Sequence, residues 1–403
     1  MQRLPIVGIV IGVAATALGF ATDIQRAALD LMICGFYAVS VGVLAMFFLS
    51  TQRLSSAKWS ASIRRIPEAL TRVVPAGILL LAIVAVAFHN IWPWMDPAHA
   101  NPEQWANIKD GFKLENGVIA HAGREVYLAP AFVYARMIIC AVLWLAFTFW
   151  FRKTSANADA SKQAGRAAHS KLNKIGGAFA VLFAFSFTAV AFDFIVSLTP
   201  DWFTTMYAVF VFAGSFALSI ATIALTLVLL IKHGKLGPNA RTQFHEPLHT
   251  LGTFLLAFST FWAYIWTCQY LLIWYGNIPE EVKFYLPRSN STWLWIFLAN
   301  VFINWIIPFF TLLPRTSKRS LKIMQAMCTL VICGHWLDMW LLVMPSKERF
   351  HDHLPLGPVE IGMAAGVIGL VALIIMRGLA KLPLVPTHDP VIEHRRQIAA
   401  HGH

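Results

Sequence analysis

A histidine and an aspartate, His335 and Asp338, lie in the otherwise apolar stretch GHWLDMW at 334–340. A spacing of three residues puts both side chains on one face of a helix, about one turn apart. Because imidazole and carboxylate groups both bind and release protons, we expect a hydrogen-bonded pair that can relay a proton. An ionisable side chain at the centre of a membrane raises the free energy of insertion by roughly 2.5–3.5 kcal/mol, so such residues usually have a functional or structural role. The alternative is a pair that only joins helices.

Two more ionisable side chains lie within long apolar stretches, and both are expected in the middle or outer half of the membrane. Arg136 lies about 12 Å into its predicted helix at 1.5 Å per residue, and Asp193 lies in AVAFDFIVSLTPDW. Arg136 is a candidate counter-ion for either Asp193 or Asp338. His89, at the border of another apolar stretch, is either an interfacial residue or a proton carrier at the outer surface.

Tryptophan and tyrosine are dense in two segments, FWAYIWTCQYLLIWYGNIPEE at 261–281 and DWFTTMY at 201–207. Trp202 has an ordinary explanation at headgroup depth, where Trp and Tyr accumulate. Tyr264 and Tyr270 are expected deeper, where buried hydroxyl groups need partners, so they either line a wet path or crosslink helices. The predicted proton path therefore consists of His335, Asp338, Asp193, Arg136, Tyr264 and Tyr270.

No motif in the sequence predicts a metal or haem bound by this chain. HEPLH at 245–249 matches the H-E-x-x-H spacing of zinc proteases, but Pro247 lies between the histidines and suits a first helical turn better. The cysteines form no C-x-x-C or C-x-x-C-H motif, which argues against disulfides, an iron–sulfur cluster and attached haem c. A haem b site needs paired deep histidines, and only His335 is deep.

Membrane helices must position these side chains, because the composition is that of a polytopic membrane protein. The 403 residues are 58% hydrophobic and 13% charged, with a mean hydropathy of +0.62, whereas soluble domains are about one-quarter charged. Ten apolar runs that can each cross a roughly 30 Å hydrocarbon core are expected at 4–22, 29–50, 71–91, 128–151, 175–197, 205–231, 248–275, 293–313, 321–344 and 358–380. The predicted fold is all-α. Helices two to five and six to nine are expected to form two four-helix bundles, with helices one and ten peripheral.

The connections predict the orientation and the domain organisation. Most Lys and Arg residues lie in connections on the side of the N-terminus, which places both termini in the cytoplasm. This bias explains the net charge of +12 better than nucleic-acid binding does. Residues 1–380 are expected to form one membrane domain, with an outer cap at 92–127 and a mobile basic linker at 152–174 near anionic lipid headgroups. A cytoplasmic tail is expected at 381–403.

Three segments, in order along the chain, resemble one family of membrane subunits. They are FDFIVSLTPDWFTTMYAVFVFAGSF at 192–216, TFLLAFSTFWAYIWTCQYLLIWYGNIPEE at 253–281 and GHWLDMWLLVMP at 334–345. Together with the expected ten-span layout, they resemble the polysulfide-reductase or NrfD-like family. Within that family the resemblance is to the F subunits of bacterial alternative complex III.

The resemblance implies a subunit of a quinol-oxidising respiratory or photosynthetic complex in a bacterial cytoplasmic membrane. Quinol, as menaquinol or ubiquinol, is oxidised near the outer face, and this chain itself holds no redox centre. Electrons then pass through iron–sulfur clusters and haem c of other subunits. The implied partners, besides lipids, are a sister NrfD-like membrane subunit, an iron–sulfur subunit, multihaem and monohaem cytochrome c subunits, and a terminal oxidase.

The resemblance also implies roles for single residues. Asp193 matches the acidic position of a segment that borders the quinol pocket in the sister subunit. That segment continues through Trp202, Thr204 and Thr205. His335 and Asp338 match a GH-x-L-D segment associated with proton conduction. The fourth expected span offers no histidine partner for Asp193, which favours a proton path or a scaffold here and a main quinol site in the sister subunit. The quinone-site candidates are Asp193, Trp202, Thr204, Thr205 and His89.

Two other classes of protein remain open from the sequence. A stand-alone proton- or cation-coupled transporter would bind its ion at His335, Asp338 and Asp193, with Pro308 as the helix interruption typical of such proteins. A purely structural membrane anchor would hold peripheral subunits through 92–127. Co-isolation of haem c and iron–sulfur signals distinguishes an electron-transfer complex from a transporter.

Overall fold

The computed structural model describes residues 3–95, 114–115, 118–119, 127–200, 202, 204–381, 383–386, 388–390 and 392. Most of the expected cap at 92–127 and of the tail at 381–403 lies outside the described residues, as do Asp201 and Phe203. The described residues form ten helices that are long and apolar enough to cross a membrane, so the ten-span prediction is confirmed. The membrane side of each end stays a prediction.

Most of the spans are single α-helices. They are α1 (Arg3–Thr22), α2 (Ile24–Leu54), α7 (Pro130–Asn157), α8 (Lys162–Phe194), α9 (Tyr207–Lys232), α11 (His245–Gly276), α17 (Leu321–Val343) and α18 (Pro358–Leu379). The third span is composite, with α3 (Arg65–Leu70), η2 (Thr71–Val73) and α4 (Val74–Ala87). The eighth span joins α14 (Leu294–Val301) to α15 (Ile307–Leu312) through the π-helical turn η7 (Phe302–Ile306).

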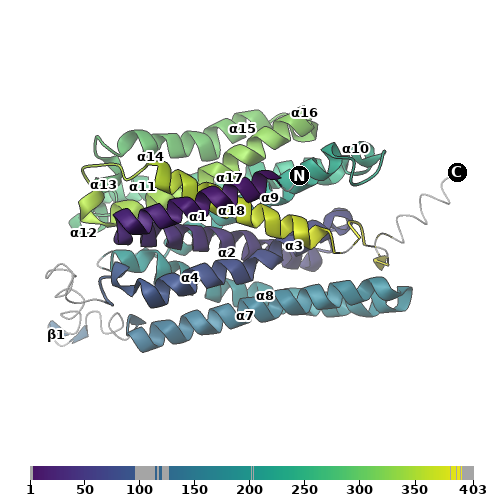
Figure 1. Ribbon diagram of the computed structural model, residues 1–403, viewed down its shortest axis with the longest axis horizontal. Helices are drawn as coiled ribbons and strands as arrows, with labels where there is room; N and C mark the ends of the chain where they lie inside the picture. The colour runs from purple at the N-terminus through teal and green to yellow at the C-terminus, as the bar shows by residue number, and fades with distance from the viewer. Residues whose placement is uncertain are drawn as a thin grey trace.

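Short elements connect the spans. They are η1 (Lys58–Ile63), η3 (His89–Ile91), η5 (Ala158–Ala160), η6 (Val196–Leu198), α10 (Ala240–Gln243), α12 (Pro279–Val282), α13 (Leu286–Ser289), α16 (Arg315–Arg319), η8 (Met344–Ser346) and η9 (Glu348–Phe350). The strands β1 (Leu114–Glu115) and β2 (Val118–Ile119) pair antiparallel. The connecting elements α12, α13 and β1 lie at one end of the bundle, and α10 and α16 lie at the other (Figure 1). We name these the outer end and the inner end, after the orientation predicted from Lys and Arg.

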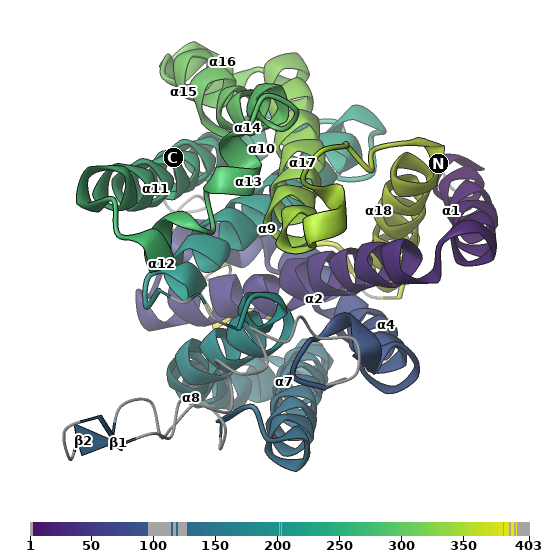
Figure 2. The ribbon, with the colours of Figure 1, turned by 90° about the vertical axis from the view of Figure 1, so that its left-hand side faces the viewer.

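The helix α2 lies at the centre of the fold, because 94% of its most apolar stretch is buried inside the protein. It contacts α4, α8 and α9, and also α1, α17 and α18. Seen from the outer end, α7 and α8 lie on one side of α2, while α11, α15 and α17 lie on the other (Figure 2). Since α2 touches helices of both expected groups, the division into two four-helix bundles stays a prediction.

The first and last helices pair at the edge of the bundle (Figure 2). Glycines make the close approach possible, because a Cβ atom on Gly12 would lie 2.4 Å from the Cα atom of Gly366. Small residues let membrane helices bring their backbones together in this way. Arg26 and Glu360 add an ion pair of 2.5 Å between α2 and α18 at the outer end. The helix α1 is otherwise largely exposed, as expected for a peripheral helix.

The expectation of a mobile linker at 152–174 is wrong, because this segment is helical. The helix α7 continues to Asn157, and after η5 the helix α8 begins at Lys162. Ser161 caps α8 by accepting a hydrogen bond of 3.1 Å from the amide of Ala164. Alanine-rich sequence favours helix, and Arg65 holds the junction through ion pairing with Asp159. Polar composition here therefore marks helix ends beyond the apolar span.

Candidate functional site

His335 and Asp338 are both buried in the outer half of α17, with 1% and 5% of their surface exposed. Their closest atoms, Nδ1 of His335 and Oδ2 of Asp338, are 3.8 Å apart. This distance exceeds a hydrogen bond. The expectation of a directly hydrogen-bonded pair is therefore wrong, although the two groups do share one face of the helix. A single proton transfer between them needs a small rotation of the imidazole or one bridging water.

Two neutral donors, one on α11 and one on α14, hold the carboxylate of Asp338. The indole Nε1 of Trp262 donates to Oδ2 at 3.1 Å, and Nδ2 of Asn300 donates to Oδ1 at 2.7 Å. Within the described ranges, no lysine or arginine forms an ion pair with this carboxylate. Neutral donors stabilise the charged form less than a cation does. The carboxylate is thus oriented by hydrogen bonds from two neighbouring helices.

The π-helical turn η7 positions the asparagine that supports this arrangement. Nδ2 of Asn304 donates to Oδ1 of Asn300 at 2.7 Å and to the carbonyl of Gly334 at 3.1 Å. A Cβ atom on Gly334 would lie 2.5 Å from Oδ1 of Asn304, so only glycine allows this approach of α17. Pro308 follows η7 and cannot donate the helical hydrogen bond to residue 304. Turns of this type are frequent at functional sites.

The imidazole of His335 is enclosed by Trp262 and Gly214. The ring centroids of His335 and Trp262 are 6.0 Å apart in an edge-on arrangement. A Cβ atom on Gly214 would come within 3.1 Å of the imidazole. Both ring nitrogens are buried without a hydrogen-bond partner among the described residues. A buried polar group in this state costs free energy, so a bound water that pairs with the imidazole would stabilise this arrangement.

A cavity of about 30 Å³ adjoins Asp338 on the side of the outer end. We name it the Asp338 cavity. Its lining includes Trp202, Thr204, Tyr207, Phe210, Trp266, Gln269, Phe284, Tyr285, Arg288, Phe297 and Asp338. A polar cavity needs roughly 10–15 Å³ to hold one water. The Asp338 cavity therefore has room for water next to the carboxylate.

A second and larger cavity, of about 390 Å³, lies between the Asp338 cavity and the outer end. We name it the mouth cavity, and its lining is Trp202, Thr204, Thr205, Gln269, Ile273, Ile278, Glu280 and Glu281. Trp202, Thr204 and Gln269 line both cavities, so the two are neighbours. The hydroxyl of Thr204 donates to Oε1 of Gln269 at 3.4 Å across the boundary between them. Together the cavities lead from two outer carboxylates to the buried one.

Arg288 is a buried cation on the wall of the Asp338 cavity, with 3% of its surface exposed. It donates to the carbonyls of Leu341 at 3.1 Å and Leu342 at 2.7 Å, at the end of α17. Its guanidinium also stacks on Phe284 at 3.6 Å. Burial lowers the pKa of Arg288 to about 10, so the group stays charged at neutral pH. Arg288 and Asp338 thus line the same cavity.

Arg136 pairs with Asp193, and not with Asp338. Two hydrogen bonds of 3.1 and 2.6 Å join the guanidinium to the carboxylate. The ring of Tyr127 stacks on the guanidinium at 3.8 Å. Burial, and then the charge of Asp193, raise the pKa of Tyr127 to about 12. Neither Asp193 nor Arg136 lines the mouth cavity or the Asp338 cavity, so this pair joins α7 to α8 at a separate place.

The remaining residues of the predicted site are Tyr264, Tyr270 and His89. Tyr264 is 63% exposed on the outside of α11, so it does not line a path inside the protein. Tyr270 packs between aromatic rings, with its centroid 5.8 Å from that of Trp266 and 5.4 Å from that of Tyr285. His89 is exposed in η3. The structure thus brings together His335, Asp338, Trp202, Thr204 and Thr205. Tyr270 packs behind the wall of the Asp338 cavity, and the other predicted residues lie elsewhere.

Four buried carboxylates of the described residues are absent from the sequence-based prediction, namely Asp30, Glu68, Glu360 and Asp389, and two of them lie in long apolar helices. Asp30 is 1% exposed in the first turns of α2, and Glu360 is fully buried in the first turn of α18. Both positions look like span margins in the sequence, where acids are common. The available signal was that both residues lie just inside expected spans, Asp30 in 29–50 and Glu360 in 358–380. Glu360 pairs with Arg26 and caps the amide of Gly357 at 2.7 Å, so it has a structural role.

The H-E-x-x-H segment lies at the start of α11, which begins at His245 with Pro247 in its first turn. Among the described residues, no group of three or more His, Cys, Asp or Glu side chains is arranged to hold a metal ion. Comparison with protein-family models and with curated proteins finds no match for the chain. The resemblance of the three segments therefore stays an expectation, and the function must be argued from the site.

Proposed function

We propose that this chain is a proton-conducting membrane subunit of a quinol-oxidising electron-transfer complex. The observation that carries the proposal is the succession of two cavities leading from the outer end to the buried carboxylate of Asp338. Intramembrane carboxylate and histidine side chains in sequence are the usual components of proton relays. In this proposal His335 passes a proton to Asp338, and Asp338 releases it through the water of the two cavities toward Glu280 and Glu281.

The neutral hydrogen-bond donors of Asp338 favour a proton relay over a purely structural contact between helices. A carboxylate that only joins helices is best held by a cation in a fixed ion pair, as Asp193 is held by Arg136. Asp338 instead has two neutral donors and an adjoining water-sized space. Arg288 lines the same cavity and donates to carbonyls of α17, so it forms no ion pair with this carboxylate. The carboxylate of Asp338 is therefore held beside the cavity without a fixed ion pair.

The mouth cavity supports a contribution to the quinone site. An aromatic wall at Trp202 and polar groups at Thr205 and Gln269 suit a flat ring that carries two oxygen atoms. Trp202 already donates its indole hydrogen to the carbonyl of Glu281 at 3.1 Å, so Thr205 and Gln269 are the available donors. Trp202, Thr204 and Thr205 thus remain quinone-site candidates, whereas Asp193 and His89 lie outside this cavity.

The wider assembly belongs to the same proposal. In a bacterial cytoplasmic membrane with both termini inside, quinol would be oxidised near the outer end, where the mouth cavity lies. A sister membrane subunit, an iron–sulfur subunit and cytochrome c subunits would carry the electrons. The ten spans would then divide into two four-helix groups, with α1 and α18 at the edge.

The test uses the intact complex reconstituted in vesicles, with quinol turnover and external pH recorded together. Gln269→Leu should obstruct the boundary between the two cavities and lower the number of protons released per electron. Tyr264→Phe changes an exposed aromatic residue of the same helix and should leave that ratio unchanged. If the complex isolates without haem c and iron–sulfur signals, or if Gln269→Leu keeps the normal ratio, the proposal is wrong.

A stand-alone proton- or cation-coupled transporter is the second candidate. The observation that favours it is the break in the eighth span, where η7 precedes Pro308 beside Asn304 and Gly334. Interrupted helices at mid-membrane are typical of ion-coupled transporters. Purification of the chain alone, with no redox subunit and with ion-driven substrate uptake in vesicles, would establish this function instead.

A further inference from the structure

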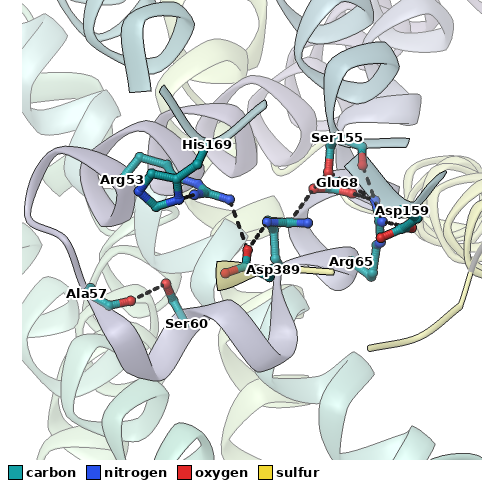
Figure 3. Close-up of polar contacts among 10 residues, drawn as sticks. Arg53, Ala57, Ser60, Arg65, Glu68, Ser155, Asp159, His169 and Asp389 are labelled. Carbon is teal, nitrogen blue, oxygen red and sulfur yellow. Dashed lines mark hydrogen bonds and ion pairs between the residues drawn. The ribbon is translucent and has the colours of Figure 1, made fainter. Parts of the chain in front are cut away.

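A cavity at the inner end has several cationic side chains in its lining. Figure 3 shows Arg53, His169 and Asp389 of this lining close together. The cavity has a volume of about 120 Å³, roughly ten times the minimum that holds one water. Its polar lining is Gln52, Arg53, Ser56, Lys58, Ser60, Arg64, His169 and Asp389, and its apolar lining is Phe48, Leu49, Ala57, Ala61 and Pro67. The cavity lies where α2 ends and η1 begins, far along the chain from the proton site.

Two buried arginines converge on this cavity. Arg64 is 5% exposed and forms ion pairs with Asp389 and, through Nε at 3.1 Å, with Glu68. Arg53 approaches the same oxygen, Oδ2 of Asp389, at 3.5 Å, and Figure 3 shows its guanidinium pointing toward this carboxylate. One carboxylate oxygen of Asp389 is therefore shared by two guanidinium groups. An anion is bound by this pair of arginines already within the protein.

Positive charge exceeds negative charge among the described side chains that line the cavity. Arg53, Arg64 and Lys58 are its cations and Asp389 is the carboxylate of this lining, while Glu68 outside the lining pairs with Arg64. Lys58 is exposed and forms no ion pair within the described part of the chain. Nη1 of Arg53 lies 3.1 Å from Nδ1 of His169 and must donate to it, so His169 is neutral in this arrangement. The hydroxyls of Ser56 and Ser60 add polar contacts. An anion with several acceptor oxygens fits this set of groups.

The apolar part of the lining identifies the source of the anion. Phe48 and Leu49 belong to the last turns of the span α2, and Trp59 packs edge-on against Phe48 at a centroid distance of 6.1 Å. Phe48 and Leu49 are both buried, with 1% and 4% of their surface exposed, so they form the apolar floor of the cavity where the span α2 ends. A phospholipid holds its phosphate at this level, next to its acyl chains. Basic pockets between membrane helices at the cytoplasmic side bind anionic lipid headgroups.

We propose that this cavity binds the phosphate group of an anionic phospholipid, with Arg53, Arg64 and Lys58 as the cationic contacts. The phosphate lies among the three cations, above the buried apolar floor that Phe48 and Leu49 form. Asp389 competes for the same two arginines, so lipid binding displaces part of its ion pairing. The site does not depend on the proton path, because none of its residues lines the Asp338 cavity or the mouth cavity.

The test measures lipid binding to the full chain after its native lipid has been removed by detergent. Thermal unfolding is recorded during titration with phosphatidylglycerol, with phosphatidylcholine and with inorganic phosphate. We expect a shift with phosphatidylglycerol and a much smaller one with phosphatidylcholine. Each cation near a membrane surface strengthens binding of anionic lipid about fivefold. Lys58→Gln should thus weaken phosphatidylglycerol binding about fivefold.

Two variants make the result decisive. Lys235→Gln removes an exposed lysine at the same end of the bundle, outside the cavity, and should leave binding unchanged. Arg53→Gln should weaken binding at least as much as Lys58→Gln. Lys58→Gln keeps all the ion pairs of the cluster, so its folding is secure even if Arg53→Gln unfolds. Equal shifts with both lipids, or equal effects of Lys58→Gln and Lys235→Gln, would overturn the proposal. Full competition by millimolar phosphate would overturn the assignment to a lipid and leave a site for free phosphate.

Discussion

Replacing Asp338 with asparagine is the sharpest perturbation of the proposed relay. The side chain keeps its size but loses the group that accepts the proton. Trp262 and Asn300 donate to the two carboxylate oxygens at 3.1 and 2.7 Å, and an amide offers only one oxygen. One donor therefore loses its acceptor, at a cost of about 1–3 kcal/mol. The removal of a buried charge offsets part of this cost, so we expect the variant to assemble.

The expected effect on proton transfer follows from the cost of an unpaired charge. Without Asp338, a proton that leaves His335 must cross the interior with no protein group to accept it. An ionised group at such depth costs roughly 2.5–3.5 kcal/mol on insertion scales. Since about 1.36 kcal/mol is tenfold in rate, proton transfer should slow by about 100-fold. Stopped-flow recording of a pH-sensitive dye outside vesicles, during one quinol pulse, measures this rate directly.

Two further variants distinguish a proton relay at Asp338 from a purely structural role of this residue. Asp338→Glu keeps a carboxylate and should recover much of the rate. Asp30→Asn removes another buried carboxylate that lines neither the mouth cavity nor the Asp338 cavity, and it should leave the rate within about twofold. A normal rate in Asp338→Asn would refute the relay and leave Asp338 as a connection between helices.

Three further predictions concern other parts of the molecule. Asp193→Asn should lower the free energy of unfolding by about 3 kcal/mol because Arg136 keeps a charge without its partner; adding Arg136→Gln should recover most of this loss in denaturation midpoints. Burial lowers the pKa of Lys347 from 10.5 to about 8, so the unfolded chain binds more protons between these values and stability should rise with pH across this window. The gain should be roughly 1–2 kcal/mol given the partial exposure of the side chain, and a Lys347→Met variant that still shows this rise would contradict the assignment. Gly12→Leu should separate α1 from α18, since even a Cβ atom at that position meets Gly366 at 2.4 Å; faster proteolysis in the connection around Asp23 would report it, whereas Ile11→Leu on the exposed face should have no effect.

The sequence predicts the spans well because their signal is local. A run of apolar residues long enough for the membrane needs no knowledge of its neighbours, and all ten runs form helices. The ends were less predictable, since α8 extends from Phe194 back to Lys162 through polar sequence. Hydropathy reports only the part of a helix that lies in hydrocarbon, while helix propensity and capping decide where the helix begins.

The candidate site was only half predictable for a related reason. His335 and Asp338 stand out because charge is rare inside a span, but Asn300 and Asn304 are neutral and attract no notice. Their importance comes from η7, a local change of helical pitch that hydrophobic periodicity does not show. Arg288 reads as a connection residue and becomes significant only because α13 places it against the end of α17. Such contacts join segments far apart in the sequence, so they depend on tertiary packing.

The pairing of α1 with α18 has a consequence for how the protein is made. Glycines 12 and 366 meet in the finished fold, yet almost the whole chain must be synthesised between them. At translation rates of about 5–20 residues per second, the first helix waits roughly 20–70 s in the bilayer before its partner emerges. During that time its glycine face is open to any other small-residue helix nearby. The last helix thus acts as a late closure of the molecule, and a chain truncated before Pro358 would leave its first helix exposed to quality-control proteases.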